Sequence, residues 1–270
     1  MRESVFSGSF YPKQKAELGN FIKSALDGAT PGNGKPISII VPHAGYIYSG
    51  RTAAYAYKCV YDFRKDYDSV IILGPNHTGL GAQIGVSEET WKTPLGTIHS
   101  DTELAKEICD ACDIAEIDEQ SHAEEHSVEV QLPFIQYIFG SIPMVAVCMG
   151  VQDFKASECM YNAISKASRK LGRKPLIVAS SDFNHYESAH EAESKDLPLI
   201  KMLEKLDAKG FNDGVVTSGD SACGYGPSTV ATLYAKAKGA KKGVLLKYSN
   251  SGMQTGDLSS VVAYASIAFF

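Results

Sequence analysis

The sequence predicts an α/β fold of three layers, in which helices cover both faces of a central sheet that is mostly parallel or mixed. Apolar, β-branched runs alternate with helix-like stretches along most of the 270 residues. These runs are continuous rather than alternating, which is typical of strands that are buried on both faces. The sequence holds no linker-like segment and no internal repeat, so we expect one domain over residues 1–270.

Runs rich in Ile, Val, Leu and Ala predict the strands of this sheet. They lie at residues 37–41, 69–73, 142–147, 175–179, 243–248 and 260–268. The segment 81–99 is rich in Gly and Thr around Trp91, which predicts a small antiparallel hairpin. Helix-like stretches lie between the strands at about 12–27, 50–63, 101–112, 126–139, 153–171, 187–206 and 224–238.

The charge balance argues against nucleic acid as a partner, because the chain carries a net charge of −5. The first residues lack the apolar core of a signal peptide, and no apolar run reaches transmembrane length. We therefore expect a cytoplasmic protein without a membrane partner. Walker, GxSxG and dinucleotide-binding sequences do not occur, so we expect no nucleotide cofactor.

The six cysteines do not have the spacing of a disulfide framework, and in a cytoplasmic chain we expect them to be reduced. Cys109 and Cys112 form one CxxC pair in a helix-like stretch. A redox or zinc role is the alternative for this pair. We interpret the two residues as half-buried helix cysteines, because no second CxxC and no nearby glycine or proline accompanies them.

Three of the predicted strands lead into a histidine. His43, His77 and His185 each lie a few residues beyond the end of an apolar run, beside Gly, Pro, Asn or Asp residues that turn the chain. Ligands of open α/β sheets bind beyond the carboxyl ends of the strands, so parallel strands would bring the three imidazoles to one edge. Neutral imidazoles are common ligands of zinc, copper and iron. The pattern predicts a metal-competent pocket.

Two other side chains are candidates for the same pocket. Asp182 precedes His185 by three residues, so it could bind a metal or orient an imidazole. Cys223 lies in a glycine-rich turn before a predicted helix, where we expect a lowered thiol pKa. The alternative for Cys223 is a small residue packed in a tight turn. Tyr46, Asn76 and Ser181 adjoin the strand ends and are predicted to line the cleft.

A second histidine cluster has the order H-x-x-E-H and contains His122 and His126. Metalloprotease chemistry would need both on one helix face, but Ser121 or Glu125 resembles a helix start that separates them. We therefore expect His126 and Glu129 to reach the rim of the cleft or to cap the helix, and His122 to be solvated.

These motifs, taken in order, resemble those of the Memo family, near its archaeal and bacterial branch called AmmeMemoRadiSam system protein B. The resemblance covers nearly the whole chain. The matching segments are SGSFYP at 7–12, PHAGY at 42–46, LGPNH at 73–77, EHSVEVQLP at 125–133, SSDFNHY at 180–186, CG at 223–224 and VVAY at 261–264.

The resemblance implies a fold similar to class III extradiol dioxygenases with a metal pocket at the strand ends. By similarity His43, His77 and Cys223 would be the ligands, with Asp182 and His185 beside them as catalytic groups. Cys223 would replace the carboxylate of the dioxygenases, which favours copper or a differently tuned iron. His185 would then act as an acid or base rather than as a ligand.

Three functions follow as hypotheses. The first is a metal-dependent oxidoreductase that uses iron or copper on a small molecule or O2. The second is a binding or scaffold module that holds a peptide or partner protein in the same cleft. The third is metal storage without turnover. The resemblance also implies a functional link to a radical-SAM protein.

Overall fold

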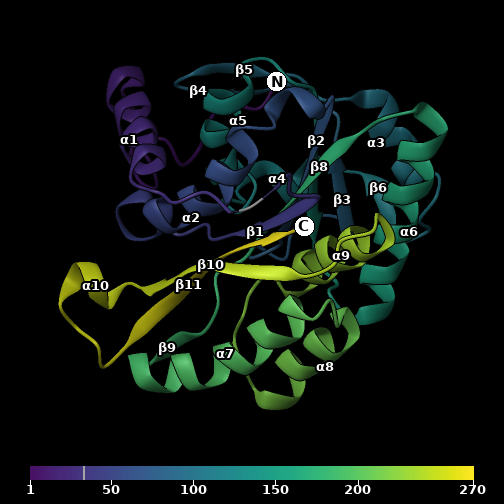
Figure 1. The fold of residues 1–270 in the computed structure, drawn as a ribbon. Coiled ribbons are helices and arrows are strands. Elements are labelled where there is room, and N and C mark those ends of the chain that lie inside the picture. The colour runs from purple at the N-terminus through teal and green to yellow at the C-terminus, as the bar shows by residue number, and fades with distance from the viewer. Residues whose placement is uncertain (33) are drawn as a thin grey trace.

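The computed structural model describes residues 1–32 and 34–270, which form helices on both sides of one large sheet (Figure 1). The strands of this sheet are β1 (Ser38–Val41), β2 (Ser69–Pro75), β3 (Ile84–Ser87), β6 (Ala115–Ile117), β7 (Met144–Met149), β8 (Pro175–Ser180), β9 (His185–Glu187), β10 (Gly243–Asn250) and β11 (Val261–Phe269). Among the described residues their order is β10-β11-β1-β8-β2-β7-β3-β6, and β9 pairs with β11 beside this path.

The centre of the sheet is parallel and its flanks are antiparallel. Strand β8 lies between β1 and β2 and is parallel to both, and β7 is parallel to β2. Strand β11 runs antiparallel to β1, and β3 runs antiparallel to β7. Every residue of β1, β2, β7 and β8 is buried, which explains why these runs are continuously apolar. The predicted central mixed sheet flanked by helices is confirmed.

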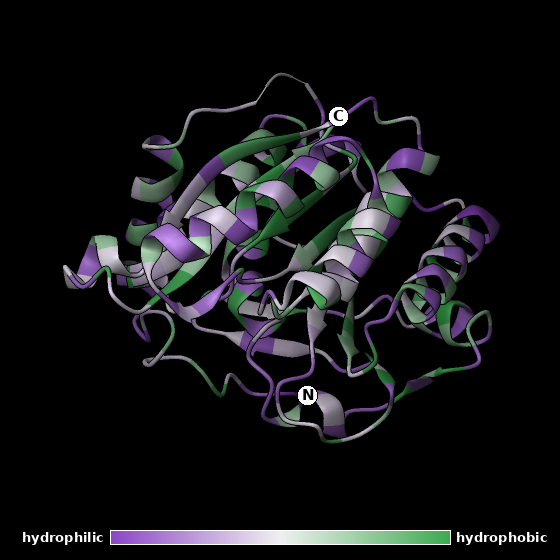
Figure 2. Ribbon diagram, turned by 90° about the horizontal axis from the view of Figure 1, so that it is seen from below, coloured by the Kyte–Doolittle hydropathy of each residue, from purple (hydrophilic) through white to green (hydrophobic). Residues whose placement is uncertain are grey.

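The helices form two layers around this sheet. Helices α1 (Lys15–Asp27), α2 (Tyr46–Tyr61) and α5 (Leu132–Phe139) bury their apolar faces on one side. The other side is covered by α3 (Thr102–Cys109), α6 (Phe154–Leu171), α7 (Ala189–Glu204), α8 (Ala208–Ser218) and α9 (Tyr225–Ala237). Figure 2 shows largely hydrophobic strands between helices whose surfaces mix both residue classes. Shorter turns are α4 (Gln120–Ala123), α10 (Gly252–Thr255), η1 (Arg64–Asp66) and η2 (Glu129–Gln131).

The secondary structure differs from the sequence prediction in a few places. The hairpin around Trp91 is present as β4 (Trp91–Thr93) and β5 (Gly96–Ile98). The sequence prediction missed the short strands β6 and β9, and it did not place β3, which lies within the segment 81–99, in the main sheet. It also missed α8, because Gly210 and Gly214 weaken its helix signal. The cap residues were the available signal for α8: the Asp207 side chain accepts a hydrogen bond from the amide of Gly210, and Gly219 ends the helix in the left-handed conformation.

The expectation that all cysteines are reduced is wrong for one pair. Cys112 and Cys159 form a disulfide that joins the segment after α3 to α6. The CxxC partner Cys109 stays free and half-buried, and burial raises the pKa of its thiol to about 11. Cys112 lies beyond the end of α3, so the interpretation as two helix cysteines holds only for Cys109. None of the helices in the described ranges is long and apolar enough to cross a membrane.

Candidate metal centre

The carboxyl ends of the parallel strands bring distant segments to one edge of the sheet. In the parallel register Val41 lies opposite Ser180, and Leu73 lies opposite Ala179. The segments that follow β1, β2 and β8 therefore leave the sheet together. They carry the predicted site residues His43, His77 and Asp182, while His185 lies slightly further on, in strand β9.

Three imidazoles converge at this edge, those of His43, His77 and His126. One nitrogen from each lies within 4.8 Å of the others. The rings of His77 and His126 stack with centroids 4.6 Å apart, and the ring of His43 is nearly perpendicular to both at 5.2 Å. His126 lines the cleft, as predicted, and it also belongs to this histidine cluster, whereas Glu129 is fully buried and pairs with Arg2.

The hydrogen bonds of His43 define its free nitrogen. Nδ1 of His43 is 2.9 Å from the hydroxyl oxygen of Ser180. That hydroxyl donates its only hydrogen to the carbonyl of Ser127, so Nδ1 of His43 carries the proton and donates it. Nε2 therefore keeps a lone pair. Burial, followed by the charges of the other histidines, holds the pKa of His43 well below its usual range.

The carboxylate of Glu125 lies close to both remaining rings, those of His77 and His126. Its Oε1 lies 2.9 Å from Nδ1 of His77 and 3.3 Å from Nδ1 of His126. Burial raises the pKa of Glu125, but hydrogen bonds from His77 and the Ser127 amide outweigh it and lower the pKa to about 2. An ionised carboxylate can only accept, so Nδ1 of His77 donates to it, which leaves Nε2 of the neutral His77 ring free. Nδ1 of His126 lies close to the same oxygen without forming a hydrogen bond to it. Burial lowers the pKa of His126 to about 4.

The predicted ligand Cys223 lies beside His43, but it is not among the residues whose donor atoms all lie within 4.8 Å of one another. Its Sγ is 3.2 Å from Nε2 of His43, and its amide donates to the carbonyl of Asp182. The lowered thiol pKa predicted for this position is wrong. Burial, reinforced by the carboxylate of Asp182, raises the pKa of Cys223 well above its usual range, so the thiol keeps its proton when no metal is bound.

The predicted catalytic pair, Asp182 and His185, lines the cleft next to this cluster. Oδ1 of Asp182 accepts the amide hydrogen of His43 at 2.8 Å, and burial raises the pKa of Asp182 to about 7. Nδ1 of His185 is 3.1 Å from the carbonyl oxygen of Ser221, to which it donates. Nε2 of His185 is therefore unprotonated, and burial lowers the pKa of the ring. Asp182 positions the first histidine, whereas His185 offers a proton acceptor.

The cleft beside these residues has a volume of about 530 Å³. Its further walls come from α10 and β11, and from Tyr48 and Tyr186. The side chain of Tyr186 is 79% exposed, and its backbone adopts the left-handed conformation, with φ of 66°. Such conformations are unfavourable for a bulky residue and gather at functional sites.

Three residues predicted to line the cleft have other positions. Tyr46 begins α2 and is 2% exposed, and its hydroxyl donates to the carbonyl of Val130. The Asn76 side chain accepts backbone amides of the following turn and donates to the carbonyl of Leu80. The buried Ser181 hydroxyl accepts the amide hydrogen of Gly224. Tyr46 packs in the core because the helix begins earlier than the predicted residue 50, and the other two are turn-forming residues.

The H-x-x-E-H motif is divided as predicted, but its first histidine is not solvated. His122 lies in α4 and is fully buried, and its Nε2 donates to the carbonyl of Gly85. His126 lies beyond the end of α4, so the two histidines share no helix face. The residue that sequence reasoning missed is Glu125, whose position beside His126 was the available signal.

The residues present fit a metal ion. Nδ1 of His43 and Nδ1 of His77 are each engaged by a hydrogen-bond partner, which leaves the Nε2 atom as the possible metal donor, and this arrangement is typical of metal-binding histidines. Nitrogen and sulfur ligands of one tetrahedral ion lie roughly 3.5 Å apart, since metal–nitrogen and metal–sulfur bonds are about 2.0 and 2.3 Å. The separation of 3.2 Å between His43 Nε2 and Cys223 Sγ is close to this value.

Comparison with known proteins identifies the relatives of the chain. A sequence model described as "Memo-like protein" matches residues 2–268. A MEMO1 family protein of Methanosarcina mazei is 40% identical over 268 residues, which cover 99% of this chain and 98% of the relative. A second, of Methanococcus maripaludis, is 42% identical over 280 residues, with 98% of each chain covered.

A solved structure supports the fold. The uncharacterized protein JW3007 of Escherichia coli K12 superposes with a TM-score of 0.54 at 13% sequence identity. The match covers 87% of this chain and all of that protein. It is consistent with the dioxygenase-like fold predicted from the sequence, and at this identity it speaks for the fold alone.

Proposed function

The chain belongs to the Memo family, and from this premise we propose that its strand-end site binds one iron or copper ion for an oxidoreductase reaction on a small molecule. The observation that carries the proposal is the convergence of the His43, His77 and His126 imidazoles. The names of the relatives leave the reaction open, so the proposal rests on the chemistry of the donor atoms.

In this proposal His43 and His77 are the principal ligands, and Cys223 and His126 supply the remaining donors. A set of imidazoles with one thiol suits copper or iron better than magnesium or calcium, which prefer oxygen ligands. Metal binding would displace the proton of the Cys223 thiol. When bound, either metal would supply one-electron chemistry to a molecule in the cleft.

The protein's own groups would handle the proton. His185 lines the cleft with an unprotonated Nε2, because its Nδ1 donates to the Ser221 carbonyl. We assign it the role of proton acceptor for a molecule bound beside the histidine cluster. Asp182 acts as a positioning residue, because its carboxylate accepts the amide hydrogen of His43.

Metal content tests the ligand assignment. The full chain is purified without chelator as wild type, His43→Ala, His77→Ala and Cys223→Ala, and metal is counted per chain by mass spectrometry. We expect about one iron or copper in the wild type and a loss of at least tenfold in affinity for each variant. His190→Ala, an exposed histidine away from the cluster, is the matched control and should keep its metal.

The absorption spectrum separates the two remaining donors. A thiolate bound to copper or iron gives a charge-transfer band, so the band should vanish in Cys223→Ala and persist in His126→Ala. Stoichiometric metal that survives His43→Ala in a folded protein would overturn the proposed ligands. Tight metal binding without any oxygen consumption or reductant turnover would indicate metal storage instead.

The aromatic rim favours one alternative, a module that holds a peptide or partner protein. Tyr186 is 79% exposed and Tyr48 37% exposed at the mouth of the cleft, where both could contact such a partner. A defined partner that is bound by the wild type and lost in Tyr186→Ala, with no metal in either protein, would favour this alternative over the oxidoreductase.

A further inference from the structure

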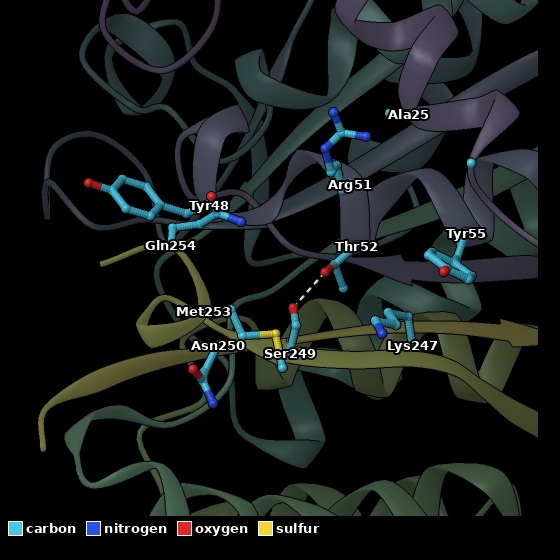
Figure 3. Close-up of a pocket in the computed structure, with 11 residues that line it drawn as sticks. Ala25, Tyr48, Arg51, Thr52, Tyr55, Lys247, Ser249, Asn250, Met253 and Gln254 are labelled. Atoms are coloured by element: carbon cyan, nitrogen blue, oxygen red, sulfur yellow. Dashed lines mark hydrogen bonds between the residues drawn. The ribbon is translucent and has the colours of Figure 1, made fainter. Parts of the chain in front are cut away.

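A second hollow lies next to the cleft and shares a wall with it. It has a volume of about 230 Å³ and opens between α1, α2, β10 and α10 (Figure 3). Tyr48 lines both the cleft and this hollow. Helix α10 separates them, since Thr255 faces the cleft whereas Met253 and Gln254 face the hollow.

The hollow is positively charged. Arg51 and Lys247 both line it, and within the described part of the chain neither side chain forms an ion pair and none of the lining residues is acidic. This is unusual in a chain whose net charge is −5. A second basic hollow, at residues 35–37 and 173–175, also holds two lysines without an ion pair in the described part of the chain, Lys174 and Lys238, but its other two cations, Arg173 and Lys35, are paired with Asp101 and Asp66.

Neutral hydrogen-bonding groups surround the two cations. The hydroxyls of Thr52 and Ser249 are hydrogen-bonded to one another at a separation of 2.6 Å, and Figure 3 shows Lys247 beside this pair and the Arg51 side chain extending away from it. The phenol of Tyr55 and the side-chain amides of Asn250 and Gln254 complete the lining. Among the described residues the amide nitrogens of Asn250 and Gln254 make no hydrogen bond, so they are available as donors to a ligand.

We propose that this hollow binds the phosphate group of a small molecule. Two unpaired cations match the charge of a phosphate monoester, which is about −1.5 to −2 at pH 7, whereas a carboxylate would neutralise only one of them. Donors on several sides of the hollow suit a tetrahedral group with several acceptor oxygens. The volume is below the roughly 300 Å³ at which pockets for drug-sized ligands begin, so the ligand is small.

Calorimetric titration of the full chain tests this site. The probes are inorganic phosphate, glycerol 3-phosphate and acetate, in a buffer that contains no phosphate. The proteins are wild type, Arg51→Gln, Lys247→Met, and the double variant Lys174→Gln/Lys238→Gln, which removes two positive charges from the other basic hollow. We expect both phosphates to bind the wild type, acetate to give no measurable heat, and each single variant to bind roughly tenfold more weakly or worse.

The control double variant should bind phosphate like the wild type. Tighter binding of glycerol 3-phosphate would identify an ester as the natural ligand, and tighter binding of inorganic phosphate would identify the free ion; both support the site. Equal affinity in Arg51→Gln and wild type, equal binding of acetate, or no heat at millimolar phosphate would each overturn it. Metal content is expected to be unchanged in Arg51→Gln, so the two proposals fail independently.

Discussion

Glu125 shows how much of the candidate site depends on one side chain. Its carboxylate reaches the Nδ1 atoms of both His77 and His126, and it also accepts the amide hydrogens of His77 and Ser127. It therefore sets the tautomer of the His77 ring and the path of two backbone segments at once. The free Nε2 atom of His77, a proposed metal ligand, follows from this one buried negative charge.

His122, which lies outside the histidine cluster, allows a test of how burial keeps a histidine ring uncharged. Burial lowers the pKa of His122 to about 4, and its buried Nδ1 has no hydrogen-bond partner among the described residues. Between about pH 6.5 and 4 the unfolded chain binds a proton that the native chain does not, so stability falls as the pH falls through this range. The difference from the ordinary pKa corresponds to a loss of about 3 kcal/mol.

Urea unfolding of metal-free protein at pH 7 and at pH 4.5 measures this loss. His122→Gln keeps a donor for the carbonyl of Gly85 but cannot take up the proton, so its free energy of unfolding should depend less on pH. The other titrating groups are common to both proteins and cancel in the comparison. Identical pH dependence in the two proteins would show that His122 does not stay neutral in the native state.

At the scale of single residues, the sequence predicts which residues lie close together in the site but not the role of each one. His43 and His77 follow strand ends, so their positions follow from the parallel topology. Tyr46 lies where α2 begins, and His126 lies where the chain turns between α4 and η2. An error of a few residues in predicting such a boundary reverses the direction in which the side chain is expected to point. The ion-pairing role of Glu125 depends on a contact across 48 positions of the chain, which local pattern does not reveal.

At the scale of elements, the turn that carries Cys223 is held against the end of β8. The amide of Cys223 donates to the carbonyl of Asp182, and the amide of Gly224 donates to the hydroxyl of Ser181. The approach is so close that a Cβ on Gly224 would lie 2.3 Å from the carbonyl oxygen of Ser180. Glycine is therefore required at position 224 because a side chain would not fit there, and not because of an unusual backbone angle.

Gly224→Ala should separate this turn from β8. Because the clash is with backbone, we expect a loss of about 1–3 kcal/mol in the free energy of unfolding, measured in urea. The shift should also carry Cys223 away from His43 and weaken the charge-transfer band of the metal-loaded protein.

Gly19→Ala in α1 is the matched control, since nothing lies within 4 Å of the added methyl group. It should stabilise the protein by about 0.5–1 kcal/mol, because alanine favours a helix interior over glycine. A Gly224→Ala protein that unfolds at the wild-type urea midpoint would contradict the close packing.

The elements that the sequence failed to predict share a cause. Strands β3 and β6 are four and three residues long, and both lie at the flank of the sheet rather than in its buried centre. Their apolar runs are too short to be distinguished from loops in the sequence. Pairing with neighbouring strands, rather than the strand propensity of their own residues, stabilises them. The central strands were predictable because complete burial demands a continuous apolar run.

At the scale of the whole molecule, the Cys112–Cys159 disulfide joins the segment after α3 to α6 across 47 residues of chain. Closing a loop of that length restricts the unfolded chain, so Cys112→Ser/Cys159→Ser should lower the free energy of unfolding by about 2–4 kcal/mol. Reductant should destabilise the wild type by a similar amount and leave the double variant unchanged. Thiol titration of the denatured, unreduced chain should find four reactive groups, and six would show that the bond does not form.

The parallel arrangement of β1, β8 and β2 also has a consequence for the order of events in folding. His43 and Cys223, whose Nε2 and Sγ atoms lie side by side, are 180 positions apart in the chain. Pairings between such distant segments form slowly, because the intervening chain must first lose much of its freedom. Partly folded forms in which β8 has not yet joined β1 and β2 contain all the donor residues but no assembled site. The proposed metal site would therefore assemble late in folding, and the time at which metal affinity appears would report completion of the sheet.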